Sequence, residues 1–271
     1  MRLFSAVIFV LLGPGLASAQ RTHDPVPFTL GYTETIHSDV LDEDRVLNIV
    51  LPQGYHPDSA ARYPVIYVLD GGADEDFIHI SGLVQFAAFE WIGWLPPSIV
   101  VGIANTDRKR DLTHPTTIAK DKADFPTTGG SAAFMRFLGK EVIPYVEASY
   151  RTFPERTLIG QSLGGLFASE VLLRQPSLFN HYIIVSPSLW WDSGSVLMIP
   201  ADSLSAPDIG VSTVYVAVGK EGKVMVNGAK KLAALAKKAY VKTGFSYLKD
   251  HDHANILHRA VLDGFRWMKE K

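Results

Sequence analysis

The stretch TLIGQSLGGLFA, residues 157–168, decides the fold. Its first three residues form a short apolar run typical of a strand, and a helical pattern begins at Leu163, so a glycine-rich turn joins a strand directly to a helix. That turn holds the G-x-S-x-G pattern of residues 160–164, which is weak alone but stands here in the strand-turn-helix setting that the motif requires. A side chain at position 160 or 164 would collide with its neighbours in so sharp a turn. The sequence therefore predicts that Ser162 is a nucleophile raised to the edge of a sheet, next to the backbone N–H of Leu163.

Short apolar runs of this kind alternate with helix-length stretches along the chain. The expected strands are residues 65–69, 99–103, 157–159, 182–185 and 214–218, and the expected helices are residues 75–94, 131–150, 163–174, 226–242 and 254–269. Two earlier extended segments, 27–37 and 45–51, suggest an antiparallel pair. Continuous apolar strands suit burial on both faces, and strand–helix alternation implies right-handed crossovers. We therefore expect an α/β fold with a mostly parallel central sheet, helices on both faces, and a site at the carboxyl ends of the strands.

The amino-acid composition excludes several kinds of partner and of nucleophile. The chain has 271 residues, of which 47% are hydrophobic and 20% charged, as in ordinary globular proteins. Its 26 basic and 28 acidic residues leave a formal charge of -2, which offers no electrostatic footprint for nucleic acid or an anionic membrane. The absence of cysteine excludes disulfides, thiolate nucleophiles and thiolate zinc sites. Any nucleophile must therefore be serine, threonine, lysine or a carboxylate.

The N-terminus has the pattern of a secretory signal peptide. Met1-Arg2 precede an apolar run over residues 3–12, and Ala17-Ser18-Ala19 form a small-x-small cleavage pattern. The run is too short to span a bilayer, and a buried N-terminal helix is the alternative. We expect cleavage after Ala19 and a periplasmic or secreted protein without a membrane anchor. The remaining 271 minus 19, or 252, residues show no repeat or linker, so residues 20–271 are expected to form one domain.

A histidine that activates Ser162 should follow it late in the chain, after a carboxylate. The candidates are His181, His251, His253 and His258. His181 precedes a strand at the wrong sheet edge and His258 falls inside the last helical pattern. His251 and His253 join the strand-like residues 245–248 to that helix, and His253 is preferred. The rival interpretation of residues 250–253 (Asp-His-Asp-His) is a metal cluster, but a single short run supplies poor geometry and no partner ligand is evident.

Glu221 is the preferred acid, because it comes directly after the expected strand ending at Val218 and its Gly219 turn. From there a carboxylate can reach a histidine on the next loop and hold its tautomer. Asp192, after the preceding strand, is the alternative. Asp250 and Asp252 lie too near the histidine in sequence to orient it.

The second donor to an oxyanion should come from the loop after the expected strand 65–69, which reads Leu69-Asp70-Gly71-Gly72-Ala73. Paired glycines let the backbone approach a ligand closely. Gly72 is preferred, and Gly71 and Ala73 remain possible.

Several segments together resemble the esterase D-like esterases of the α/β-hydrolase fold, nearest to the siderophore (enterobactin-type) esterase branch. They are residues 63–71 (YPVIYVLDG), 108–113 (RKRDLT), 160–165 (GQSLGG), 186–191 (SPSLWW) and 252–254 (DHA). The resemblance runs from about Pro27 to Met268 and implies a serine carboxylic ester hydrolase without a cofactor. It supports His253 and is compatible with Glu221. The chain departs from the family by having Thr113-His114-Pro115 where Thr-Pro is common.

Residues 107–130 lack any periodicity, which predicts a functional or mobile loop, or a surface insertion. Arg108 and Arg110 in this segment and the pair Trp190-Trp191 are candidates for a substrate wall, since guanidinium and indole faces suit an aromatic or carboxylated ester. The alternatives are a surface ion pair, such as Arg110 with Asp111, and core tryptophans. The lysines at 230, 231, 237 and 238 indicate a solvated helix face.

These features predict an exported serine esterase that binds a small-molecule ester and needs no metal or cofactor. An acyltransferase with the same triad is the second enzymatic hypothesis. The third is a non-catalytic binding protein that kept the hydrolase fold.

Overall fold

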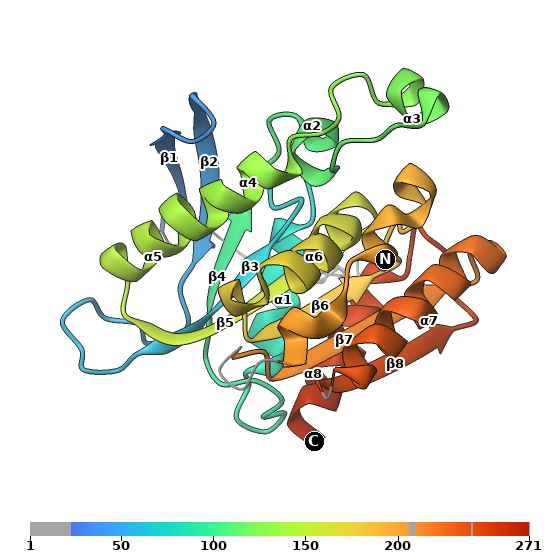
Figure 1. The fold of residues 1–271 in the computed structure, drawn as a ribbon. Coiled ribbons are helices and arrows are strands. Elements are labelled where there is room, and N and C mark those ends of the chain that lie inside the picture. The colour runs from blue at the N-terminus through green and yellow to red at the C-terminus, as the bar shows by residue number, and fades with distance from the viewer. Residues whose placement is uncertain (1–22, 206–209, 240, 271) are drawn as a thin grey trace, which may run out of the picture. The chain divides into compact units, whose positions relative to one another are not determined.

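Eight strands form one sheet in the order β1-β2-β4-β3-β5-β6-β7-β8 (Figure 1). The structure is a computed structural model that describes residues 23–205, 210–239 and 241–270, so the expected signal peptide lies outside the described residues. Residues 31–271 form a single compact unit. Only the β1–β2 and β2–β4 pairs are antiparallel, and every other neighbouring pair is parallel. The predicted mostly parallel sheet is confirmed.

The strands overlap the extended segments expected from the sequence. They are β1 (Tyr32–Ser38), β2 (Glu43–Val50), β3 (Tyr63–Val68), β4 (Ile99–Ile103), β5 (Thr152–Gln161), β6 (His181–Val185), β7 (Thr213–Gly219) and β8 (Lys242–Leu248). The α-helices are α1 (Phe77–Ala87), α2 (Arg108–Leu112), α3 (Ala119–Asp124), α4 (Ser131–Phe137), α5 (Ile143–Ser149), α6 (Leu163–Arg174), α7 (Gly222–Lys238) and α8 (Leu257–Glu270). Shorter turns are the π-turn η1 (Leu138–Val142) and the 3₁₀ segments η2 (Pro176–Leu178), η3 (Trp191–Met198) and η4 (Ala201–Ser205).

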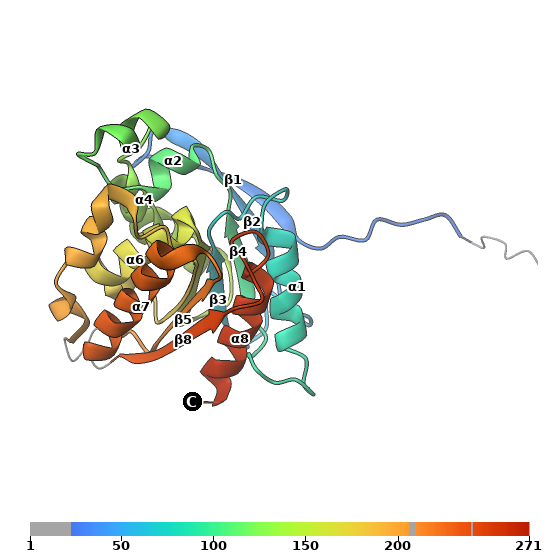
Figure 2. The ribbon, with the colours of Figure 1, turned by 90° about the vertical axis from the view of Figure 1, so that its right-hand side faces the viewer.

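Helices cover both faces of the sheet (Figure 2). Buried side chains of α1 and α8 pack on one face, whereas those of α4, α5, α6 and α7 pack on the other. Along β7, Val214, Val216 and Val218 face the second layer while Tyr215 and Ala217 face the first. A strand buried on both faces reads as a continuous apolar run, which is why composition located these strands.

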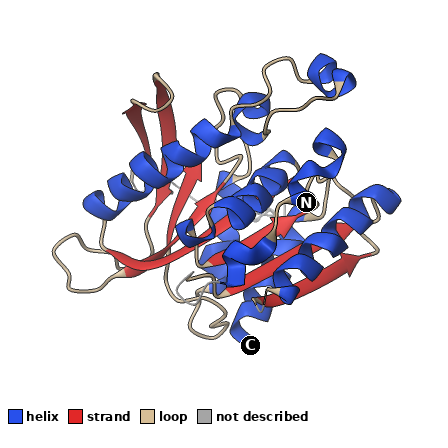
Figure 3. Ribbon diagram, in the orientation of Figure 1, coloured by secondary structure: helices blue, strands red, loops and turns tan. Residues whose placement is uncertain are grey.

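Several segments differ from the sequence-based expectation. The helix expected over 75–94 ends at Ala87, the strand expected from residue 157 begins at Thr152, and the extended segment expected from residue 27 is a strand only from Tyr32. The loop 107–130 contains the short helices α2 and α3 (Figure 3). The helix expected over 131–150 is interrupted by η1, where the backbone N–H of Ile143 donates to the carbonyl of Leu138, one residue farther than in an α-helix. Pro144 lacks an N–H and therefore cannot complete the regular ladder at this point.

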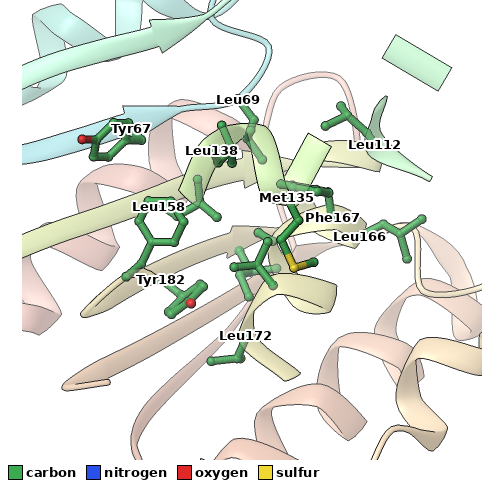
Figure 4. Packing of buried hydrophobic residues seen from close by; sticks show 14 of the residues in the cluster. Tyr67, Leu69, Leu112, Met135, Leu138, Leu158, Leu166, Phe167, Leu172 and Tyr182 are labelled. Carbon is green, nitrogen blue, oxygen red and sulfur yellow. The ribbon is translucent and has the colours of Figure 1, made fainter. Parts of the chain in front are cut away.

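The core between the sheet and α6 is densely aromatic. Leu158 of β5, Tyr182 of β6 and Phe167 of α6 are fully buried there (Figure 4). The ring of Phe167 lies 5.1 Å, centroid to centroid, from that of Phe134 on α4. Because α6 begins at Leu163, directly after Ser162, this packing fixes the height of the predicted nucleophile above the sheet.

We expect Phe167→Ala to lower the free energy of unfolding by about 3–5 kcal/mol, since a large side chain is removed from a close-packed site that relaxes only partly. Urea denaturation measures the change. The matched control is Phe153→Ala in β5, where the side chain is 49% exposed and the loss should be much smaller. Equal losses in the two variants would contradict the assignment of Phe167 to the core.

Candidate active site

Ser162 lies in the turn between β5 and α6 with φ 60° and ψ -117°. A positive φ is costly for any residue except glycine, and it marks the strained turn that presents a nucleophile. A Cβ at Gly160 would lie 2.5 Å from the carbonyl oxygen of Gly164, so glycine is required there as expected. At Gly164 the nearest atom would be 3.3 Å away, whereas at Gly165 a Cβ would lie 2.9 Å from Pro187 Cα. The second crowded position is therefore 165, where the helix approaches the loop after β6.

Ser162, His253 and Glu221 form a continuous hydrogen-bonded line. Ser162 Oγ lies 2.9 Å from His253 Nε2, and His253 Nδ1 lies 2.5 Å from Glu221 Oε2. An ionised carboxylate only accepts hydrogen bonds, so Nδ1 donates its proton to Glu221 and Nε2 of the neutral ring is left to accept the Ser162 hydroxyl. The three residues that the sequence singled out on three separate loops thus meet at the carboxyl edge of the sheet.

Glu221 is held by more than the histidine. Its side chain is 5% exposed. Oε1 accepts hydrogen bonds from Ser186 Oγ at 2.5 Å and from the Gly219 amide at 3.0 Å. Burial raises the pKa of Glu221, but the hydrogen bonds from His253, Ser186 and Gly219 together outweigh it and leave the pKa below its ordinary value. The carboxylate is therefore ionised at neutral pH, the form that can hold the histidine tautomer.

The loop that carries His253 is anchored at two strand ends. Gln161 Nε2, from the last residue of β5, donates to the His253 carbonyl at 2.6 Å. The Lys220 amide, just after β7, donates to the His251 carbonyl at 2.7 Å. His251, the alternative base, thus contributes its backbone to the loop while the ring of His253 faces Ser162.

The predicted oxyanion donors differ in availability. Leu163 is the first residue of α6, and the first N–H groups of a helix have no acceptor within the helix. The Gly72 amide, in contrast, donates to the carboxylate of Glu75 at 2.6 Å. Gly71 is no substitute, because its amide donates to the Ile103 carbonyl at 2.9 Å. In this conformation the Gly72 amide therefore reaches an oxyanion only if Glu75 moves away.

Ser162 and His253 open onto a cleft of about 410 Å³. Three carboxylates line it, Asp70, Glu75 and Asp76, together with Arg108. Arg108 Nε and Nη2 lie 2.6 and 2.8 Å from the two carboxylate oxygens of Asp70. This guanidinium neutralises one of the three charges and lines the cleft, as expected for a substrate-wall residue.

The ionised form of Asp76 is destabilised by its surroundings in this cleft. Burial, and secondarily the negative charge of Asp70, raises its pKa to about 6. The folded state therefore binds this proton more tightly than the unfolded chain, whose aspartate pKa is about 3.9, and stability falls as pH rises between these two values.

We expect Asp76→Asn to be more stable than the parent protein at pH 7 by about 1–2 kcal/mol, because the side chain is 30% exposed and solvent reduces the full effect. The difference should shrink toward zero near pH 4, where the parent carboxyl is protonated in the folded protein. Urea denaturation of both proteins from pH 4 to pH 8 measures it. A difference that stays constant with pH would contradict the raised pKa.

The other substrate-wall candidates lie elsewhere. Arg110 is bound to the carboxylates of Glu43 at 2.5 Å and Asp111 at 2.7 Å, which is the ion-pair alternative. Trp191 is fully buried and donates its indole N–H to the His114 carbonyl at 2.8 Å, as a core tryptophan. Trp190 is 39% exposed but lines a different groove. Of the four candidates, Arg108 lines the cleft.

Asp192, the alternative acid, faces away from the histidine. Its carboxylate accepts hydrogen bonds from Thr116 Oγ1 at 2.9 Å and from the Thr117 amide at 3.0 Å, and its own amide donates to Asp121 at 3.0 Å. These contacts tie η3 to the segment around α3. The structure thus gives Asp192 a role in holding a loop.

Three further residues support the site and were not predicted from the sequence: Gln161, Ser186 and Ser188. Ser188 Oγ lies 3.4 Å from Ser162 Oγ, and the Ser188 amide donates to the Ser162 carbonyl at 3.0 Å. Ser186 follows β6 directly, so its position at the carboxyl edge was an available signal. Nothing in the sequence indicated which of the polar residues at that edge would reach Glu221.

Comparisons with known proteins identify the family and the fold of this chain. The ferri-bacillibactin esterase BesA of Bacillus subtilis (strain 168) is 33% identical over 183 residues, which cover 63% of this chain and 63% of that protein. The crystal structure of an IroE-like serine hydrolase from Shewanella oneidensis has a TM-score of 0.79 and 28% identity, over 89% of this chain and 80% of that one. The BES protein from Bacillus cereus has a TM-score of 0.79 and 26% identity, over 93% and 99% of the two chains. Both structures confirm the α/β-hydrolase fold.

The match to the Bacillus subtilis relative spans less than two thirds of that protein's length. The family described as putative esterase matches residues 38–255, most of the 271-residue chain, including all three members of the hydrogen-bonded line. By that match the chain belongs to the putative-esterase family of α/β-hydrolases.

Proposed function

We propose that this protein hydrolyses carboxylic esters through an acyl-enzyme formed on Ser162, with His253 as general base and Glu221 as the acid that orients it. The observation that carries the proposal is the pair of contacts from Ser162 Oγ to His253 Nε2 at 2.9 Å and from His253 Nδ1 to Glu221 at 2.5 Å. Both distances lie within reach for proton transfer without rearrangement. The strained backbone of Ser162 is the cost expected for presenting the hydroxyl in this way.

The reaction follows from the positions of these groups. Ser162 Oγ attacks the ester carbonyl carbon while its proton passes to His253 Nε2, and the carbonyl oxygen becomes an oxyanion. The imidazolium is stabilised by the ionised Glu221. His253 then protonates the leaving alcohol as the C–O bond breaks. A water molecule, deprotonated by the same histidine, releases the acid from Ser162.

The oxyanion would be stabilised by the amides of Leu163 and Gly72, once the Glu75 carboxylate has left the second of these. A carboxylate at that position competes with the oxyanion for one donor and repels its charge. Losing one oxyanion donor typically costs about 10²- to 10³-fold in turnover. The position of Glu75 therefore bears directly on the rate.

We expect Glu75→Ala to raise kcat/KM for a short p-nitrophenyl ester by about ten- to a hundredfold, because a hydrogen bond to a charged group is worth about 1.5–3 kcal/mol and 1.4 kcal/mol is tenfold. Steady-state kinetics measure the change. Asp74→Ala, which removes an exposed carboxylate from the same loop, is the matched control and should leave the rate unchanged. A folded Glu75→Ala variant that is slower than the parent would show that this carboxylate supports the active loop.

The substrate class that we propose is a siderophore-type ester, in which several acyl groups are joined through ester bonds. Support comes from the relatives, which are named as a ferri-bacillibactin esterase and a siderophore triacetylfusarinine C esterase, and from the polar, charged lining of the cleft. Hydrogen-bond donors on such a substrate would find acceptors in Asp70, Glu75 and Asp76.

The test is hydrolysis of a catecholate trilactone by the purified protein, followed by mass spectrometry. The expected products are linear fragments that have gained one water for each ester opened. Products that carry an added alcohol acceptor in place of water would identify an acyltransferase. Tight binding with no turnover of either the trilactone or short p-nitrophenyl esters would overturn the proposal and leave a binding protein on the same fold.

A further inference from the structure

A second hollow lies between η3 and α7 and shares no lining residue with the Ser162 cleft. Its volume is about 680 Å³, within the range of sites for small molecules. Apolar side chains make up most of its wall: Leu189, Trp190, Leu197, Met198, Val224 and Leu235. We call this hollow the α7 groove.

The wall of the α7 groove is unusually open to solvent. Met198 is 82% exposed, Val224 66% and Trp190 39%. Single exposed apolar residues are common on protein surfaces, but a concave group of them marks a binding site. Met198 and the leucines are flexible enough to adapt to an alkyl chain.

The charged part of the wall consists of Lys231 and Lys238. They are seven residues apart on α7 and therefore lie on the same side of the helix, about 10 Å apart along its axis. Within the described part of the chain neither ammonium group has a carboxylate within ion-pair distance. The four lysines at 230, 231, 237 and 238 were expected to form a solvated helix face, but Lys231 and Lys238 line the groove and only Lys230 and Lys237 lie outside it.

We propose that the α7 groove binds an amphiphile with a single negative charge, specifically the anion of a medium-chain fatty acid. The alkyl chain would lie along Leu189, Leu197 and Leu235, and the carboxylate would pair with Lys231 or Lys238. Charge complementarity selects an anion, since the groove offers two unpaired cations and none of its lining residues is acidic. This site is independent of the esterase chemistry proposed above.

Isothermal titration calorimetry with dodecanoate, below its micellar concentration, tests the proposal. We expect one dodecanoate per chain. Dodecyltrimethylammonium, which has the same chain and the opposite charge, should bind at least tenfold more weakly, and acetate should not bind. Failure of dodecanoate to bind, or equal binding of the cationic amphiphile, would overturn the assignment.

Two double variants on one helix localise the site. Lys231→Gln with Lys238→Gln should weaken dodecanoate binding by about two- to fivefold, because the carboxylate pairs with one of the two lysines and an ion pair at an exposed site is worth up to about 1 kcal/mol. Lys230→Gln with Lys237→Gln removes the same charge from the same helix outside the groove and should leave binding unchanged. Equal effects of the two variants would mean that the anion responds only to net charge, which contradicts the proposal.

A third variant tests the alternative that a second copy of the chain covers the groove. Leu235→Glu places a negative charge among the apolar side chains and should abolish dodecanoate binding. Light scattering of the parent protein over a range of concentrations is measured alongside. If the parent dimerises, and both Leu235→Glu and dodecanoate leave the dimer intact, the groove is free for the anion as proposed. If Leu235→Glu separates the dimer and dodecanoate does not, the groove is an interface between two copies and the proposal is wrong.

Discussion

Replacing Ser162 with alanine is expected to lower kcat for a short p-nitrophenyl ester by about 10⁴-fold or more, because the covalent route is lost with the hydroxyl. The residual rate would come from substrate binding and the oxyanion donors alone. Steady-state kinetics measure the loss, and a fluorophosphonate probe should label the parent protein stoichiometrically and leave the variant unlabelled. The methyl side chain of alanine fits the turn, although the positive φ of position 162 stays costly.

Ser188→Ala is the matched control. The Ser188 hydroxyl lies 3.4 Å from Ser162 Oγ and is buried, so its removal changes the polar surroundings of the proposed nucleophile but leaves Ser162 in place. We expect less than a tenfold decrease in kcat and unchanged labelling. Hydrolysis by a folded Ser162→Ala protein at the parent rate would refute the assignment of the nucleophile.

The site residues that the sequence predicted correctly to lie together are residues that follow the ends of strands. Ser162, Glu221 and His253 each follow β5, β7 or β8 closely, and parallel strands bring their carboxyl ends to one edge of the sheet. Buried strands are recognisable as apolar runs, so the edge, and the order of residues along it, follow from pattern alone. The same reasoning explains why Ser186, directly after β6, could have been found.

The parts that the sequence did not predict depend on where individual side chains point. Arg110 forms an ion pair with Glu43, a residue 67 positions earlier in the chain. This contact exists only because α2 lies against β2 in the folded chain. Trp190 and Trp191 are adjacent in sequence, yet Trp191 is buried in the core whereas Trp190 lines the α7 groove. The occupation of the Gly72 amide by Glu75 depends on the conformation of a four-residue turn, which no periodicity encodes.

Glu221, the proposed triad acid, offers the second test with a large effect. We expect Glu221→Gln to lower kcat by about 10²- to 10⁴-fold, since a carboxamide no longer stabilises the imidazolium and can donate to Nδ1, which favours the wrong tautomer. Asp192→Asn should change kcat by less than tenfold, because its carboxylate holds Thr116 and Thr117 and not the histidine. Both substitutions remove one negative charge at nearly constant shape, so they are matched.

The two variants also separate catalysis from folding. The pKa of Glu221 is lowered in the folded protein, so its ionised form adds stability that is present at neutral pH and disappears as pH falls through that lowered pKa. Glu221→Gln should therefore be less stable than the parent protein at pH 7, and the gap should narrow in acid. An inactive variant that remains folded at pH 7 places the loss in the chemistry of the triad. A folded Asp192→Asn protein that is slower than Glu221→Gln would instead assign the acid to the loop after β6, against the 2.5 Å contact between Glu221 and His253.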